Sequence, residues 1–152
     1  MSDTKKPLEQ GNKDTSTEDL HNRRFFDMCQ EMAKTGSWEC SSSNNRTFWS
    51  TELYRILGLP ETMDPDHATF LAQVHDDDRT WVEERYRESI DHGKSHDITY
   101  RLKGPAEATR HIRDRCEHET GEDGNIERSY GFLQDITELE ETRRRIDREQ
   151  AI

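Results

Sequence analysis

The sequence predicts an α+β fold in which a five-stranded antiparallel sheet carries short helices across one face and a helix at each end. Strict alternation of side chains, typical of a half-buried strand, runs through residues 95–103 and 125–136. Apolar residues three or four positions apart, typical of an amphipathic helix, recur in 16–34 and 79–91. Turns separate these segments, and the glycine-containing stretch 121–124 predicts a hairpin between the last two strands.

The composition is that of one small domain with polar ends. Of the 152 residues, 29% are hydrophobic and 36% are charged. The chain has 22 Lys and Arg against 33 Asp and Glu, a net charge of −11. This charge argues against nucleic acid or an anionic membrane surface as a partner.

The hydropathy and the cysteine content indicate the cellular location of the protein. No apolar run approaches the roughly 18 residues that a membrane helix needs, and the sequence shows no signal peptide. Cys29, Cys40 and Cys116 are widely spaced and odd in number, which is typical of reduced thiols. We therefore expect a cytoplasmic protein that neither crosses nor binds a membrane.

The first third of the chain divides into four segments. Residues 1–15 are polar and without a period, so we expect them to be disordered. Residues 16–34 predict a helix whose apolar stripe must pack on the sheet or on a partner. Two short strands follow at 37–40 and 46–50, joined by a turn rich in Ser and Asn.

Capping signals define the next two helices. Ser50 is expected to cap a short helix that ends at Gly58, where a left-handed residue is favoured. The run His75-Asp76-Asp77-Asp78 admits two interpretations, because its carboxylates could bind a hard cation or could cap a helix and offset its dipole. The helical pattern of 79–91, followed by Gly93, favours the capping interpretation.

Three strands complete the predicted sheet. In the first, at 95–103, Ile98, Tyr100 and Leu102 share one face. In the second, at 109–119, arginines alternate with acids, which predicts cross-strand ion pairs on the exposed face. In the last strand we place the even-numbered side chains, which include Phe132, toward the interior.

The spacing of side chains changes from the alternation of a strand to that of a helix where the last strand ends. Asp135 or Thr137 can cap a charged helix that begins at Glu138 and carries Leu139 and Ile146 one heptad apart. Two interpretations stay open for this helix. It is either a frayed, solvated tail or a dimer seam that resembles a coiled coil.

Four stretches carry a resemblance to a known family. They are GSWE at 36–39, FWSTELYRILGL at 48–59, FLAQVHDDDR at 70–79 and GFLQDITE at 131–138. In this order and spacing they resemble a PAS domain, of the subtype common in bacterial and archaeal sensor histidine kinases, over about residues 33–138.

Two positions depart from the family pattern. Asp76 stands where the family's junction has a proline, and no tryptophan stands near His111. The second departure leaves the local sheet face, and any partner surface on it, in question.

The resemblance implies a sensory interior, whose ligand the sequence does not identify. A flavin-binding relative would need a reactive cysteine within Asn-Cys-Arg-Phe-Leu-Gln, which is missing here, although Gln134 stands where such domains have a flavin-contacting glutamine. A haem-binding relative would need an inward histidine on the long helix 79–91, which has none. A small apolar ligand is possible, or the inward residues simply fill the core. The pocket candidates are Phe48, Leu57, Phe70, Trp81, Tyr86, Ile98, Tyr100, Phe132 and Gln134.

No metal or catalytic site is predicted. Strand alternation puts His111 on the face opposite Cys116 and His118, and no Cys-x-x-Cys pattern is present. The chain has no phosphate loop or kinase ATP signature, and no histidine on the last helix. We therefore expect no enzymatic activity, with any kinase in a separate domain or partner.

The resemblance implies a sensor or dimerisation module of two-component signalling. In this hypothesis Asp135, Ile136 and Thr137 relay a packing change to the helix that follows, and this helix acts on a downstream effector domain or kinase. The alternative is a ligand-free interaction scaffold that uses its terminal helices, 16–34 and 139–152. In either case we expect a homodimer, with a seam formed by Phe25, Phe26, Met32, Leu139 and Ile146.

Overall fold

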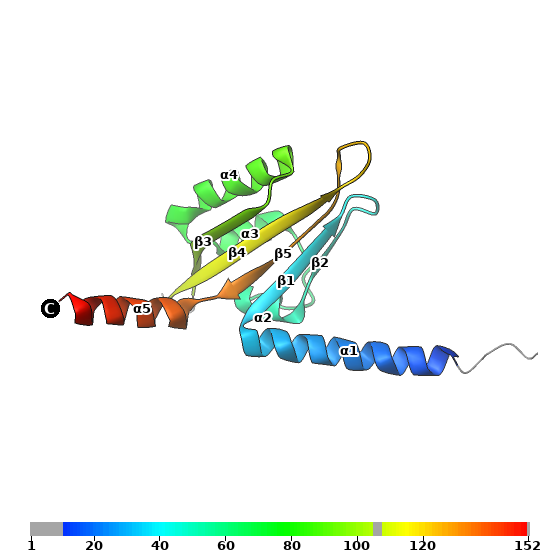
Figure 1. Cartoon of the computed structure of the whole chain (residues 1–152), viewed down its shortest axis with the longest axis horizontal. Coiled ribbons are helices and arrows are strands. Elements are labelled where there is room, and N and C mark those ends of the chain that lie inside the picture. Colours follow the sequence, from blue (N-terminus) through cyan, green and yellow to red (C-terminus); the bar gives the residue numbers. More distant parts are fainter. Residues whose placement is uncertain (1–10, 105–107, 152) are drawn as a thin grey trace, which may run out of the picture.

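A computed structural model describes residues 11–104 and 108–151, and within them it confirms the predicted fold class. Five antiparallel strands form one sheet in the order β2-β1-β5-β4-β3, and helices α2, α3 and α4 cover one of its faces (Figure 1). The elements are α1 (Gly11–Ala33), β1 (Thr35–Ser41), β2 (Arg46–Trp49), α2 (Thr51–Leu57), α3 (His67–Gln73), α4 (Asp76–His92), β3 (His96–Lys103), β4 (Thr109–Thr120), β5 (Ile126–Asp135) and α5 (Thr137–Gln150).

The element bounds differ from the predicted ones in a few places. Helix α1 begins at Gly11, within the stretch expected to be disordered, whose residues 1–10 lie outside the described residues. The short helix α3 is an addition to the predicted elements. Residues 105–107, between β3 and β4, also lie outside the described residues.

Both predicted caps of helix α2 are confirmed. The Ser50 hydroxyl oxygen accepts a hydrogen bond from the Leu53 backbone N–H at 3.3 Å. Gly58 ends the helix with φ +71°, a conformation that L side chains rarely adopt. Helix α2 lies directly on β1, because a Cβ atom at Gly36 would come within 2.4 Å of the Leu53 Cα. A residue without a side chain is therefore required where β1 meets this helix.

Helix α4 begins with a different cap from the predicted one. The His75 Nδ1 atom accepts the hydrogen bond from the Asp77 backbone N–H at 3.1 Å. The acids lie in the first turn, where the helix dipole favours them. Asp78 binds Arg101 of β3 through three hydrogen bonds of 2.8–2.9 Å, which tie the start of α4 to the edge of the sheet.

The hydrophobic core lies between the sheet and the three covering helices. Large side chains of α2, α3 and α4 meet those of β3, β4 and β5 there. None of the described helices is long and apolar enough to cross a membrane. The most deeply buried core residues are Leu53, Ile56, Leu57, Val74, Val82, Tyr100, Leu102, Ile112, Cys116 and Leu133.

The Asp78–Arg101 pair predicts how stability depends on pH. Hydrogen bonds from Arg101 lower the pKa of Asp78 from 3.8 to about 2. The stabilisation is therefore complete above pH 3.8 and is lost as pH falls toward 2. We expect Asp78→Asn to lower the free energy of unfolding at pH 7 by about 1 kcal/mol, because solvent screens the partly exposed pair. Urea unfolding measures this change.

Asp77→Asn is the matched control, because it removes the same charge from the same helical turn. The Asp77 carboxylate lies 3.9 Å from the His75 Nδ1 atom and is 77% exposed, so we expect a much smaller change. Equal losses of stability in the two variants would contradict the role given to the Arg101 contact.

Candidate functional site

A fully buried carboxylate lies at the centre of the helix-covered face. Asp114 of β4 has an exposed fraction of 0%. Its Oδ2 atom accepts hydrogen bonds from the Tyr86 hydroxyl at 2.5 Å and the Tyr100 hydroxyl at 2.6 Å. Its Oδ1 atom lies 3.0 Å from the His96 Nε2 atom. Three polar groups from α4 and β3 thus converge on one side chain of β4.

The hydroxyl groups of this centre are fixed as donors. Burial, together with the nearby Asp114 carboxylate, raises the pKa of Tyr86 and of Tyr100 well above 10. Both hydroxyls therefore keep their protons at physiological pH. Short hydrogen bonds from neutral donors to a buried carboxylate are charge-assisted and stronger than neutral ones.

Aromatic rings hold the two tyrosines in place. The Tyr86 ring has the His67, Phe70 and His96 rings at centroid distances of 5.3, 5.5 and 4.7 Å. The Tyr100 ring has Phe70 and Trp81 at 6.3 Å each. The donors therefore owe their positions to packing as well as to Asp114.

A second polar chain runs beside this centre. The Ser89 hydroxyl lies 2.7 Å from His118 Nε2, and His118 Nδ1 lies 2.7 Å from the Ser129 hydroxyl. Burial lowers the pKa of His118 and raises that of the neighbouring Cys116 to about 12. Cys116 is therefore a buried thiol without thiolate character.

Most of the predicted pocket residues come together in this interior. Leu57, Phe70, Tyr86 and Tyr100 are buried in the core, and Trp81 and Ile98 pack against it. Sequence reasoning did not single out Asp114, whose place among alternating arginines and acids on β4 suggested an exposed face.

The predicted inward face of β5 was wrong. Leu133 is the core residue of this strand, paired in register with Gly36 of β1 and Asp114 of β4. Phe132 and Gln134 alternate with Leu133 and therefore lie on the outer face of the sheet. Phe48 is also outside, because it is 57% exposed and alternates with the buried Trp49.

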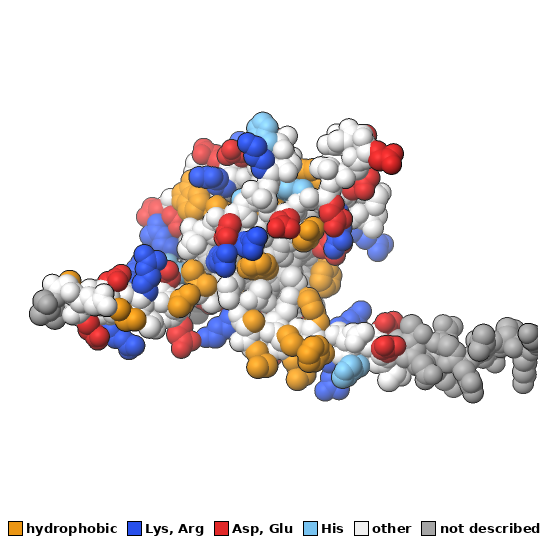
Figure 2. All heavy atoms as spheres, in the orientation of Figure 1, with side chains coloured by type: hydrophobic (Ala, Val, Ile, Leu, Met, Phe, Trp, Pro, Cys, Tyr) orange, Lys and Arg blue, Asp and Glu red, His pale blue; other side chains and the backbone are white. Residues whose placement is uncertain are grey.

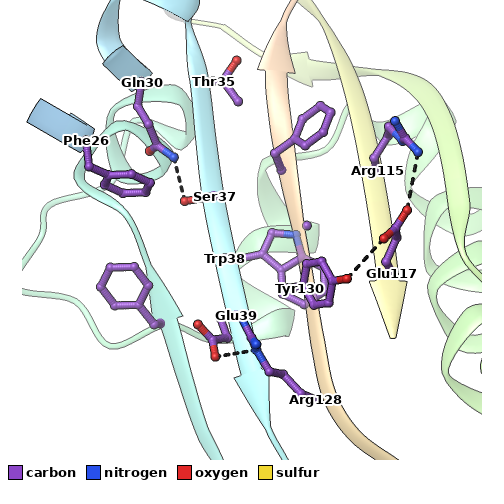
Figure 3. Close-up of a pocket in the computed structure, with 13 residues that line it drawn as sticks. Phe26, Gln30, Thr35, Ser37, Trp38, Glu39, Arg115, Glu117, Arg128 and Tyr130 are labelled. Atoms are coloured by element: carbon purple, nitrogen blue, oxygen red, sulfur yellow. Dashed lines mark hydrogen bonds and ion pairs between the residues drawn. The ribbon is translucent and has the colours of Figure 1, made fainter. Parts of the chain in front are cut away.

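Two of these outer residues, Phe48 of β2 and Phe132 of β5, line a groove on the uncovered face of the sheet, and Gln134 does not. The groove has a volume of about 540 Å³. Phe26 of α1 lies along it, and Tyr130 of β5 forms part of its floor (Figure 3). Ion pairs occupy its rim, with Arg128 and Glu39 2.7 Å apart.

Helix α1 forms a wall of this groove and also exposes apolar side chains to solvent. The Gln30 side chain donates a hydrogen bond to the Ser37 hydroxyl at 2.7 Å, which holds α1 against β1. Figure 2 shows hydrophobic side chains gathered where α1 passes below the sheet. Phe25, Met28 and Met32 of α1 are 61%, 56% and 84% exposed.

The predicted relay residues lie where both terminal helices meet the sheet. Helices α1 and α5 leave the same end of the sheet in opposite directions (Figure 1). Asp135 accepts hydrogen bonds from the Thr137 backbone N–H at 3.0 Å and from its hydroxyl. The Thr137 hydroxyl oxygen accepts in turn from the His111 N–H of β4 at 3.0 Å. The N-cap of α5 is Ile136, without a side-chain cap, so neither Asp135 nor Thr137 occupies the predicted capping position. Asp135 instead binds Thr137, the first residue of the helix, from the position before the cap.

Three further contacts complete this junction. The Asp135 backbone N–H donates to the Lys34 carbonyl oxygen at 2.8 Å, and the Ile136 N–H donates to the His111 carbonyl oxygen at 2.9 Å. The Lys34 ammonium group lies 3.1 Å from the Glu138 carboxylate. One short segment thus contacts the end of α1, the start of α5 and strand β4.

The five predicted seam residues lie on the two terminal helices. Four of them, Phe25, Met32, Leu139 and Ile146, are at least 45% exposed and project from the folded core. Phe26 differs, because it lines the groove of its own chain. The described residues contain no group of three or more His, Cys, Asp or Glu side chains arranged to hold a metal ion.

Comparison with known proteins places this architecture in a family. The model of the family described as PAS fold matches residues 46–133, which is more than half of the chain. A curated relative, the sensor protein FixL of Bradyrhizobium diazoefficiens, is 26% identical over 103 residues, covering 68% of this chain. The chain spans only 20% of the length of that relative.

Solved structures have the same fold. One is a sensory box histidine kinase/response regulator from Burkholderia thailandensis, with 24% identity and a TM-score of 0.58, covering 83% of this chain and 96% of that one. Another is the N-terminal domain of a diguanylate cyclase with a PAS/PAC sensor from Marinobacter aquaeolei, with 20% identity and a TM-score of 0.61. The match covers 70% of this chain and 98% of that one.

Proposed function

This chain belongs to the family of the PAS fold, and we propose that it is a sensory module that passes a change in packing to helix α5. The module has no catalytic role of its own in this proposal. Its output is a histidine kinase or a comparable effector domain that α5 contacts, either in a longer protein or in a partner. The observation that carries the proposal is the contact between β4 and the first turn of α5.

Strand β4 provides a physical route from the interior to the output helix. Asp114, which accepts the hydrogen bonds of Tyr86 and Tyr100, lies three residues from His111 on the same strand. The backbone N–H and C=O groups of His111 bind Thr137 and Ile136. A shift of β4 that follows a change in the interior therefore displaces the first turn of α5. Such a change acts only if it favours one of the two arrangements over the other.

The relay hypothesis predicts the effect of removing Asp135. In a fusion of this chain to a histidine kinase domain after α5, Asp135→Ala removes the acceptor of two Thr137 hydrogen bonds. We expect the first turn of α5 to fray and kinase output to change several-fold, because each lost hydrogen bond costs about 1 kcal/mol. Autophosphorylation of the fusion measures the output.

Asp123→Ala is the matched control for this experiment. Asp123 also accepts a local backbone hydrogen bond, from Asn125, but it lies in the hairpin turn far from α5. We expect its output to stay at the wild-type level. If Asp135→Ala also leaves the output unchanged, the relay hypothesis is wrong.

The second candidate function is an interaction scaffold, and the exposed apolar surface of α1 favours it. Phe25, Met28 and Met32 are spaced by three and four residues, so they form one stripe along the helix. Such a stripe is typical of a surface that a second helix covers. We propose that the chain is a homodimer in both candidate functions, with Leu139 and Ile146 extending the contact along α5.

The dimer proposal predicts a mass in solution of twice that of one chain. Sedimentation equilibrium of the wild-type chain should give a dimer. Phe25→Glu should weaken association at least about tenfold, because a charge would be buried in an apolar contact. Met63→Glu, at a residue that is 39% exposed in the loop between α2 and α3, is the control and should leave the dimer intact. A wild-type monomer would rule out both seams.

A further inference from the structure

The partners of Asp114 distinguish it from other well-bonded acids of the sheet and its edge. Asp78 and Asp97 each bind an arginine side chain, Arg101 and Arg113 respectively. Within the described residues, the carboxylate of Asp114 instead accepts from two phenol hydroxyls and contacts an imidazole. A phenol hydroxyl, unlike a guanidinium group, binds an anion by a directed hydrogen bond alone.

The donors come from elements other than β4 and are held by their own neighbours. Helix α4 positions the Tyr86 hydroxyl, and the Tyr86 ring packs on Phe70 and His67. The Tyr100 hydroxyl is positioned by β3, whose strand pairing sets Tyr100 opposite Ile112 rather than opposite Asp114. These groups would therefore still converge if the Asp114 carboxylate were removed.

An empty centre of this kind would hold buried polar groups without partners. Tyr86 and Tyr100 are 6% and 2% exposed, and the His96 side chain is 6% exposed. Buried donors that lose their acceptor are costly, so the centre has a strong requirement for an anion of carboxylate shape. Asp114 meets this requirement with a side chain of the same molecule.

We propose that Tyr86, Tyr100 and His96 form a binding site for a small carboxylate, and that Asp114 is its tethered occupant. The inference rests on the proposed sensory function and deepens it, because it names the group that fills the interior. A molecule that displaces Asp114 from this site must carry a carboxylate of its own. A neutral apolar group in the place of Asp114 would leave the three polar groups unpaired.

Chemical rescue tests this proposal. Asp114→Ala keeps Cβ and removes the carboxylate, which formate can replace atom for atom. Thermal unfolding is followed in sodium formate and in sodium chloride of equal concentration. We expect the unfolding midpoint of the variant to rise with formate in a saturable manner, while that of the wild-type chain is the same in both salts. In Asp114→Ala combined with Tyr100→Phe, formate should bind about tenfold more weakly, because one charge-assisted hydrogen bond is missing.

Asp97→Ala is the matched control. It removes a carboxylate from the opposite face of the sheet, where Asp97 binds Arg113 in solvent, and formate should leave its midpoint unchanged.

If Asp114→Ala is unfolded in chloride, circular dichroism should show formate-dependent recovery of the fold. If formate changes neither the unfolding midpoint nor the circular dichroism of Asp114→Ala, the proposal is wrong. The experiment measures binding in the isolated chain, so this result would leave the relay and dimer hypotheses standing.

Discussion

The positions of α4, β3 and β4 depend on the hydrogen bonds of one buried carboxylate. Asp114 has no contact with solvent, and each of its hydrogen bonds crosses from β4 to another element. Tyr86 fixes the middle of α4 over the sheet, and Tyr100 and His96 fix β3 beside β4. A buried charge with a missing partner destabilises a fold strongly, so the positions of helix and strand depend on one another here.

The same strand that carries this carboxylate also binds the first turn of α5. His111 on β4 binds both Ile136 and Thr137 through its backbone, while Asp135 binds the carbonyl oxygen of Lys34. Both terminal helices are thus attached at one end of the sheet, on neighbouring strands. In the proposed relay, these bonds pass a movement of β4 to α5, and β5 passes it to α1.

Local chemistry made much of the fold predictable, and its limits explain the errors. Ser50 and Gly58 carry capping signals that depend only on neighbouring backbone, so α2 was predicted correctly. The inward face of β5 was assigned incorrectly because Tyr130 and Phe132 are aromatic, although they form the floor of a groove beside α1. Asp114 was missed because its partners are distant in sequence, 28 and 14 residues away. Only tertiary structure brings two tyrosines and a histidine to one aspartate.

The coupling between the interior and α5 is tested most directly by amide hydrogen exchange in Asp114→Asn. This variant preserves side-chain volume and removes the charge that the tyrosine hydroxyls bind. If β4 transmits the change, exchange at the Ile136 and Thr137 amides should become faster, along with exchange in β3 and α4. Faster exchange confined to β3 and α4, with α5 unchanged, would contradict the proposed route from the buried carboxylate to the output helix.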